Sequence, residues 1–262
     1  MMPSRSIWNG SLRFAGVALP VKLHAAVEDR TVRFHLLHDR DKQRVRQRLI
    51  DPEKGKEVAR EEVRRGYEIE SGVFVVLEDA ELAQLDPEPS KEIEITRFVP
   101  LGQGLYPWYE RPYYLSPDGN EREYFALAEA LARAEREGVA RWVMRKRHYV
   151  GALREEGGYL MLVALRHAGE VVDASALPAP SGPAPSAKEL AMAEQLVAML
   201  EEEYEPGLFH DEYRKRLEDL IEAKSKGKLY TFERPAAKRR TEDLERALSA
   251  SLTKARKERK SA

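Results

Sequence analysis

The sequence predicts an α+β protein with a β-barrel core, followed by helices and a basic tail. Three observations support this fold class. The first 175 residues contain many short β-branched or aromatic runs and few helical patterns, as in barrels. A proline-rich stretch then interrupts the chain, and the residues after it repeat at helical spacing.

The strands are predicted from alternation and from bounded apolar runs. Apolar residues from Leu12 to Leu23 alternate with smaller or polar ones, which predicts two strands that turn at Ala15-Gly16. β-branched or aromatic runs predict further strands, at 73–77, 93–99, 113–115, 139–147 and 159–165.

Helices are predicted from their start signals and their apolar faces. A helix over 121–135 places Tyr124, Leu127, Ala128 and Leu131 on one face. Ser186 and Glu189 form a capping box that starts a second helix, and a third spans about 210–226 and ends at Gly227. The predicted domains are therefore a core at 1–176, a linker at 177–185, a helical segment at 186–230 and a flexible basic tail at 231–262.

Composition excludes several classes of protein. The 262 residues include 44 Lys or Arg and 45 Asp or Glu, so the net charge is -1 and does not indicate a partner. With no cysteine, disulfides, thiolate metal sites and cysteine nucleophiles are excluded. Because no leader or long apolar run is apparent, we expect a cytoplasmic protein without a membrane segment.

The charges are nevertheless segregated along the chain. Residues 33–48 carry a net charge of +4 and residues 51–94 carry -8. Residues 185–222 carry -7, and residues 224–262 carry +8. Such zones allow one part of a protein to bind a polyanion while another part repels it.

Arg44, Arg46 and Arg48 form the first candidate site. On a strand they would share one face at roughly 6.6 Å spacing, close to the phosphate spacing of one DNA strand. A solvated edge strand protected by its charges is the alternative, and the local pattern alone favours it.

A second basic strand face is predicted at 141–147. Alternation there separates the cations Arg141, Arg145 and Arg147 from Trp142 and Met144, and Lys146 adds charge. Lys22 points away from the apolar face of its own strand. Several basic strand faces favour a phosphate groove, although spacing does not show that they converge.

Other patterns are weighed as catalytic or metal sites. His35 and His38 with Asp39 lack the converging ligands that a metal needs, and neighbouring Phe34, Leu36 and Leu37 predict core packing. The aromatic run 106–114 favours a structural role over base stacking. No nucleotide-binding or nucleophile motif is present, so we expect no catalytic residue, metal or cofactor.

The tail holds two basic clusters. Lys238, Arg239 and Arg240 form the first, and residues 254–260 form the second. These cations would add sequence-independent phosphate contacts. A solubilising tail is an equally good interpretation.

The order of motifs resembles the bacterial Ku family over nearly the whole chain. The matching motifs are Ile7-Trp8-Asn9-Gly10-Ser11, 17–23, 33–38, Gly66-Tyr67-Glu68, 93–95 with 98–99, 111–117, 165–166 with 170–171, 189–193 and 210–213. Each motif alone is weak, whereas their order and spacing together are specific.

The resemblance implies a β-barrel whose extended arms interlock in a homodimer. The resulting ring would thread onto double-stranded DNA ends without reading sequence, in double-strand break repair by non-homologous end joining. It also implies an end-joining DNA ligase of the ligase D type as a partner, a location on the nucleoid, and no enzymatic activity. Residues resembling the ligase-recruiting region of relatives include Asp243, Leu244 and Leu248.

The chain departs from the family pattern in one loop. Many relatives carry a C-x-x-C pair just after the arginine segment, where this chain has Asp51 and Lys54. A metal or redox role of that loop is therefore not expected. Two alternatives stay open: a nucleic-acid-processing enzyme that uses His35 and His38, and a scaffold that does not touch DNA.

Overall fold

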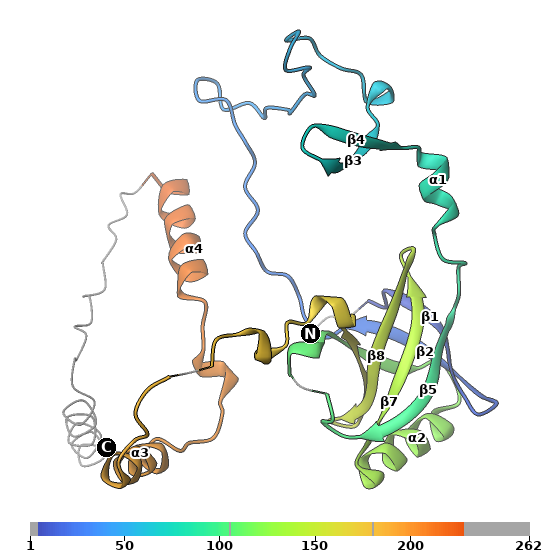
Figure 1. Ribbon diagram of the computed structural model, residues 1–262, viewed down its shortest axis with the longest axis vertical. Helices are drawn as coiled ribbons and strands as arrows, with labels where there is room; N and C mark the ends of the chain where they lie inside the picture. Colours follow the sequence, from blue (N-terminus) through green and yellow to red (C-terminus); the bar gives the residue numbers. More distant parts are fainter. Residues whose placement is uncertain (1–4, 105, 180, 228–262) are drawn as a thin grey trace. The chain divides into compact units, whose positions relative to one another are not determined.

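In the computed structural model, which describes residues 5–104, 106–179 and 181–227, seven strands close into a β-barrel. The strand order is β1-β2-β6-β9-β8-β7-β5. Their bounds are β1 Trp8–Phe14, β2 Val17–Ala25, β5 Glu92–Pro100, β6 Tyr109–Pro117, β7 Arg136–Met144, β8 Arg147–Glu156 and β9 Tyr159–Leu165. The predicted α+β fold class with a β-barrel core is confirmed (Figure 1).

The barrel closes where β1 pairs with β5 in parallel. Leu12 faces Ile93 in this short register, whereas the other neighbouring strands of the barrel are antiparallel. Between β1 and β2, Ala15 and Gly16 both adopt positive φ, which is the geometry of a two-residue hairpin turn. The predicted turn at Ala15-Gly16 is confirmed.

Alternation along the strands builds the core. Leu12, Leu23 and Leu115 are fully buried, as the apolar pattern predicts. The helix α2 (Glu121–Ala134) lies against β7 and β8 and buries Tyr124, Leu127, Ala128 and Leu131, the four residues predicted for its inner face. The predicted helix over 121–135 is therefore confirmed.

Tyr124 joins α2 to the barrel through two hydrogen bonds. Its hydroxyl donates to the carbonyl of Leu115 at 2.6 Å and accepts from the amide of Leu160 at 2.8 Å. Tyr124→Phe leaves both buried backbone groups unpaired, so we expect it to lower the free energy of unfolding by about 2–3 kcal/mol in a urea titration. Phe125→Leu, at an exposed neighbouring position, serves as the control. A loss of under about 0.5 kcal/mol in Tyr124→Phe would contradict the role of these bonds.

Residues 26–91 form an arm that leaves the barrel after β2 and returns into β5 (Figure 1). The arm contains a 3₁₀ turn at Arg60–Glu62, the hairpin of β3 (Arg65–Glu70) and β4 (Val73–Leu77), and helix α1 (Asp79–Gln84). Strands β3 and β4 pair with each other as a separate two-stranded sheet. We call this hairpin the arm ribbon.

The apolar side chains of the arm are exposed. Phe34, Leu36 and Leu37 are 68%, 63% and 51% exposed, so the prediction that they pack in a core is wrong for the single chain. The reason is that the barrel is already closed and filled by its own strands and α2. Apolar side chains exposed together on the arm favour burial against a partner.

The chain divides into two compact units, at 1–176 and 177–262. Short 3₁₀ turns lie at Tyr106–Trp108, Ala168–Glu170, Ala174–Ala176 and Pro206–Leu208. The second unit contains α3 (Ala187–Met199), which begins at the predicted Ser186/Glu189 capping box, and α4 (Glu212–Ser225), which is capped by Asp211. Both predicted helices are confirmed. Across the described part of the chain, no helix is long and apolar enough to span a bilayer.

Candidate nucleic-acid interface

Two consecutive loops of the arm enclose the arginine segment, residues 44–48. In the first loop the amide of His38 donates to the carbonyl of Gln43 at 2.8 Å, and Leu37 bridges to Arg44. In the second loop Ile50 bridges to Glu57. The amide of Val45 also donates to the carbonyl of Leu36 at 3.1 Å, but no backbone pairing of this kind continues from 46 to 48, so no ladder forms along the segment. The prediction of a strand at 44–48 is therefore wrong.

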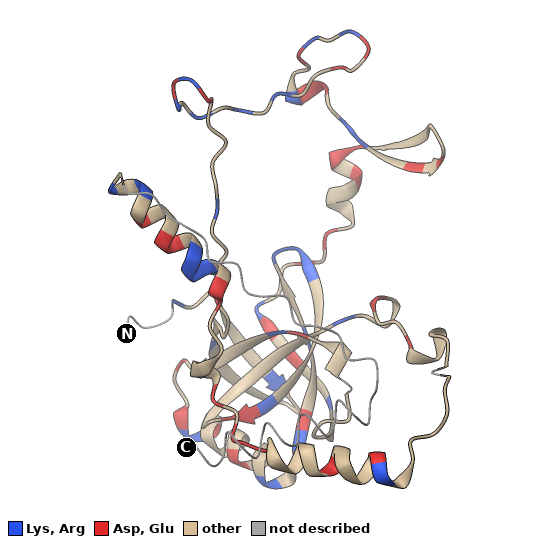
Figure 2. Cartoon of the chain, turned by 90° about the vertical axis from the view of Figure 1, so that its left-hand side faces the viewer, with Lys and Arg blue, Asp and Glu red and all other residues tan. Residues whose placement is uncertain are grey.

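The three arginines of this segment differ in how their charge is used. Nη1 of Arg48 lies 2.7 Å from Oε2 of Glu57, which partly neutralises it. Within the described ranges, Arg44 and Arg46 have no acidic partner, and both are exposed. Two cations per chain are therefore available here for phosphates. Figure 2 shows that the arm carries both basic and acidic residues.

The loop at Asp51 is held by the side chain of Asp51 itself. Oδ1 of Asp51 accepts from the amides of Glu53 and Lys54 at 2.9 Å and 3.2 Å. Nζ of Lys54 lies 3.8 Å from Oδ2 of the same carboxylate. The two residues at the positions of the C-x-x-C pair thus cap and neutralise their own turn.

The basic segment 141–147 is a hairpin and not a single strand. β7 ends at Met144 and β8 begins at Arg147, because Arg145 and Lys146 adopt φ of 51° and 62° and form the turn. The predicted continuous strand through Arg147 is wrong, and so is its alternation beyond Met144. The sequence did not indicate this turn because neither central residue is the Gly or Asn that such turns favour.

The cations of the hairpin also divide into paired and unpaired. Nζ of Lys146 lies 2.6 Å from Oδ2 of Asp86. Arg141 is exposed on β7, opposite Glu94 on β5. Among the described residues, none forms an ion pair with Arg141, Arg145 or Arg147. These three arginines are therefore available for phosphates.

A basic pair at positive φ costs stability, which motivates a substitution. We expect Arg145→Asn with Lys146→Gly to raise the free energy of unfolding by about 1 kcal/mol, since Asn-Gly suits this turn and the lost surface ion pair is worth little. We expect the same variant to weaken DNA binding in a fluorescence anisotropy titration, because Arg145 is removed. Ala15→Asn, which creates Asn-Gly in the β1–β2 turn, should raise stability and leave DNA binding unchanged. Unchanged DNA binding in the first variant would remove Arg145 from the interface.

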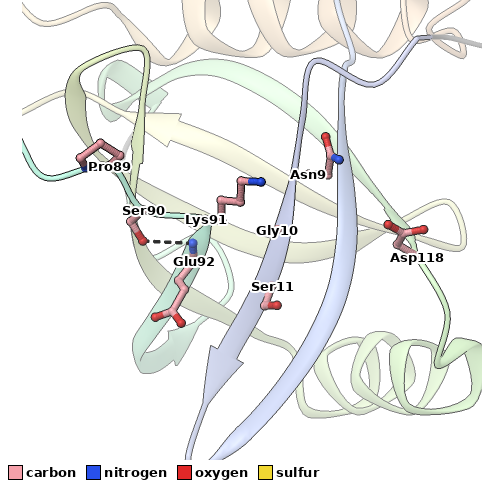
Figure 3. Close-up of a pocket in the computed structure, with 8 residues that line it drawn as sticks. All are labelled: Asn9, Gly10, Ser11, Pro89, Ser90, Lys91, Glu92 and Asp118. Atoms are coloured by element: carbon pink, nitrogen blue, oxygen red, sulfur yellow. Dashed lines mark hydrogen bonds between the residues drawn. The ribbon is translucent and has the colours of Figure 1, made fainter.

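Lys22 lies on β2 with its ammonium 2.6 Å from Oδ1 of Asp118. Asp118 also lines a shallow pocket of about 550 Å³ in which Asn9, Ser11 and Lys91 present polar groups. Figure 3 shows the side chain of Lys91 beside β1. Lys91 is exposed, and the described part of the chain gives it no acidic partner. It is a cation that the sequence analysis missed, because the β1–β5 pairing that positions it joins residues far apart in sequence.

The histidine pair does not form a metal centre within the described residues, where no group of three or more metal-binding side chains occurs. Nδ1 of His38 lies 2.8 Å from Oδ1 of Asp41. The hydrogen bond from the amide of Gln43, and then that from His38, hold the pKa of Asp41 below its usual value. The contact between His38 and Asp41 therefore stays within the loop.

Glu137 is a buried carboxylate at 3% exposure. The hydroxyl of Tyr109 donates to its two oxygens at 3.2 Å and 3.3 Å. Burial raises the pKa of Tyr109, and the charge of Glu137 raises it further. This pair satisfies a buried charge at the barrel and does not present a reactive group to solvent.

The remaining predicted site residues are in the tail. Lys238, Arg239 and Arg240 lie outside the described residues, as do Asp243, Leu244 and Leu248. Their roles stay predictions.

Comparison with known proteins identifies the family. Residues 13–192 match the Ku70/Ku80 beta-barrel domain. The chain is 37% identical over 255 residues to "Non-homologous end joining protein Ku 2" of Geotalea uraniireducens, covering 97% of this chain and 99% of that protein. It is 38% identical to "Non-homologous end joining protein Ku" of Anaeromyxobacter sp. (97% and 87% covered) and 35% identical to that of Coxiella burnetii (90% and 88%). The barrel, the arm and these matches together show that the chain belongs to the Ku family.

Proposed function

We propose that the protein binds double-stranded DNA ends as a homodimeric ring in non-homologous end joining. In this proposal it contacts phosphates without reading base sequence, protects and bridges the ends, and recruits a DNA ligase of the ligase D type. Its role is binding and not catalysis. The names of its relatives support the repair process.

The observation that carries the proposal is the composition of the arm. The same segment that presents the unpaired Arg44 and Arg46 also presents an arm ribbon whose apolar side chains are uncovered. A two-stranded hairpin is marginally stable alone, so its exposed faces favour a second copy as the partner. An arm that dimerises and also carries cations suits a ring around a polyanion.

Sequence independence is supported by the type of contact available. The candidate cations without an ion pair include Arg44, Arg46 and Lys91, and such side chains suit phosphate oxygens. They are carried by loops, a hairpin turn and strands. No described helix groups Asn, Gln and Arg for base-edge contacts in a major groove.

The proposal is tested with the full chain and two linear duplexes of unrelated sequence. We expect a dimer by light scattering, equal affinity for both duplexes, and affinity that falls steeply as salt rises. Deletion after Arg234 should reduce stimulation of a ligase D type enzyme, with binding of the ends retained. A monomer, or a preference for one sequence, would overturn the proposal.

A further inference from the structure

Residues 200–221 carry apolar side chains that nothing covers within the described chain. Tyr204 and Phe209 stack on each other, with ring centroids 5.5 Å apart, yet they are 77% and 71% exposed. Leu208 and Phe209 line a pocket of about 670 Å³ together with polar residues of α4. None of the residues of α4 is buried. We call residues 200–221 the acidic segment.

The acidic segment also carries unpaired carboxylates. Glu201, Glu202, Glu203, Glu205 and Asp219 have no ion pair with any residue that the structure describes. The cations of α4 are partly used within the helix, because Arg214 and Arg216 pair with acids one turn away. The free charge of this surface is therefore mainly negative, next to exposed aromatic rings.

The chain that follows has the opposite balance. Residues 228–262, which lie outside the described residues, contain eleven Lys or Arg and five Asp or Glu. Leu244, Leu248 and Leu252 follow each other at intervals of four. This segment thus offers both the charge and the apolar groups that complement the acidic segment.

We propose that the acidic segment binds the basic residues 228–262 of its own chain, and that duplex DNA competes for those residues. The second part rests on the proposed function. Covalent attachment gives the tail a local concentration on the order of millimolar, which no free partner matches. DNA itself is repelled by the carboxylates, and a second acidic segment is repelled in the same way.

Such binding restrains nonspecific contacts of the tail. While the tail cations face carboxylates, they are not available to bind DNA away from an end. A duplex held by the ring raises the local phosphate concentration and draws the tail to the DNA. The same exchange frees the acidic segment for another basic partner.

The absence of cysteine permits a direct measurement in the full-length chain. Gln195→Cys in α3 and Ser249→Cys are labelled with a donor and an acceptor dye, and labelled chains are diluted into excess unlabelled protein. We expect energy transfer at low salt without DNA, and loss of transfer as salt rises to about 0.5 M, because salt screens the attraction. Added linear duplex should also lower the transfer.

Substitutions assign the contact to the acidic segment. The first triple variant carries Glu201→Gln, Glu202→Gln and Glu203→Gln. These positions lie between α3 and α4, so we expect circular dichroism to show that both helices are kept. We expect this variant to lower the energy transfer and to raise DNA affinity about fivefold. The control with the same charge change is Glu121→Gln, Glu123→Gln and Glu129→Gln, three exposed positions on α2. It should leave the transfer unchanged.

The outcomes separate the two proposals. Transfer that is independent of salt and equal in the two triple variants overturns the docking, and this result needs no DNA. Duplex that is bound but leaves the transfer unchanged overturns the competition. Absence of any binding to linear duplex contradicts the proposed function, while the DNA-free comparison still decides the docking.

Discussion

Arg44→Gln with Arg46→Gln is expected to weaken binding to linear duplex about 100-fold at roughly 0.1 M salt. Both arginines are exposed and without an acidic partner in the described chain, so each can release counterions from a phosphate. A dimer loses four such contacts. The slope of log affinity against log salt should therefore become shallower by about 3 to 4.

The same segment provides the control. Arg48→Gln removes an arginine that is paired with Glu57 at 2.7 Å, and contact with DNA would first have to break that pair. We expect a loss several-fold smaller than in the double variant. Equal losses would show that pairing within the arm does not decide which arginines bind phosphate. No loss in the double variant would remove the arginine segment from the interface.

Phe74→Asp with Val76→Asp is expected to convert the dimer to a monomer and to abolish stable binding to DNA ends. Phe74 and Val76 lie on one face of the arm ribbon and are 58% and 55% exposed. Burying two unpaired carboxylates in an interface costs several kcal/mol, which exceeds what a small interface can lose. Sedimentation velocity at micromolar protein measures the change.

Val172→Asp is the matched control, because Val172 belongs to the first unit but not to the arm and is 76% exposed. It should leave the dimer intact. Near-ultraviolet circular dichroism should show that the barrel of the ribbon variant is folded, since the ribbon pairs with no barrel strand. A ribbon variant that remains dimeric would place the interface elsewhere.

The barrel could be predicted because its signals are local. The alternation from Leu12 to Leu23 defines two strands and their inner faces, and the turn between them contains a glycine. The inner face of α2 was likewise predicted correctly, at all four of its buried positions. These elements bury their apolar side chains within the same chain, so pattern and burial agree.

The arm could not be predicted in the same way. Phe34, Leu36 and Leu37 have the pattern of core residues, yet the single chain leaves them exposed. Sequence pattern reports that a side chain favours burial and does not report which chain buries it. The hairpin turn at Arg145-Lys146 was missed for a different reason, because its residues are unusual for that geometry.

The sequence predicted the candidate site from its basic residue types, and the structure then showed which of these residues are engaged in ion pairs. Lys22, Arg48 and Lys146 look as basic in the sequence as Arg44, Arg46 and Arg141. Their ion pairs with Asp118, Glu57 and Asp86 span from 9 to 96 positions of sequence. Only a folded chain shows which cations remain available.

The most direct test of the ring compares a linear duplex with a covalently closed circle of the same sequence. A closed ring of protein loads only over an end, so we expect tight binding to the linear form and weak, salt-sensitive binding to the circle. Cutting the circle once with a restriction enzyme should restore tight binding. Equal affinity for the circle and the linear form would contradict threading onto DNA ends.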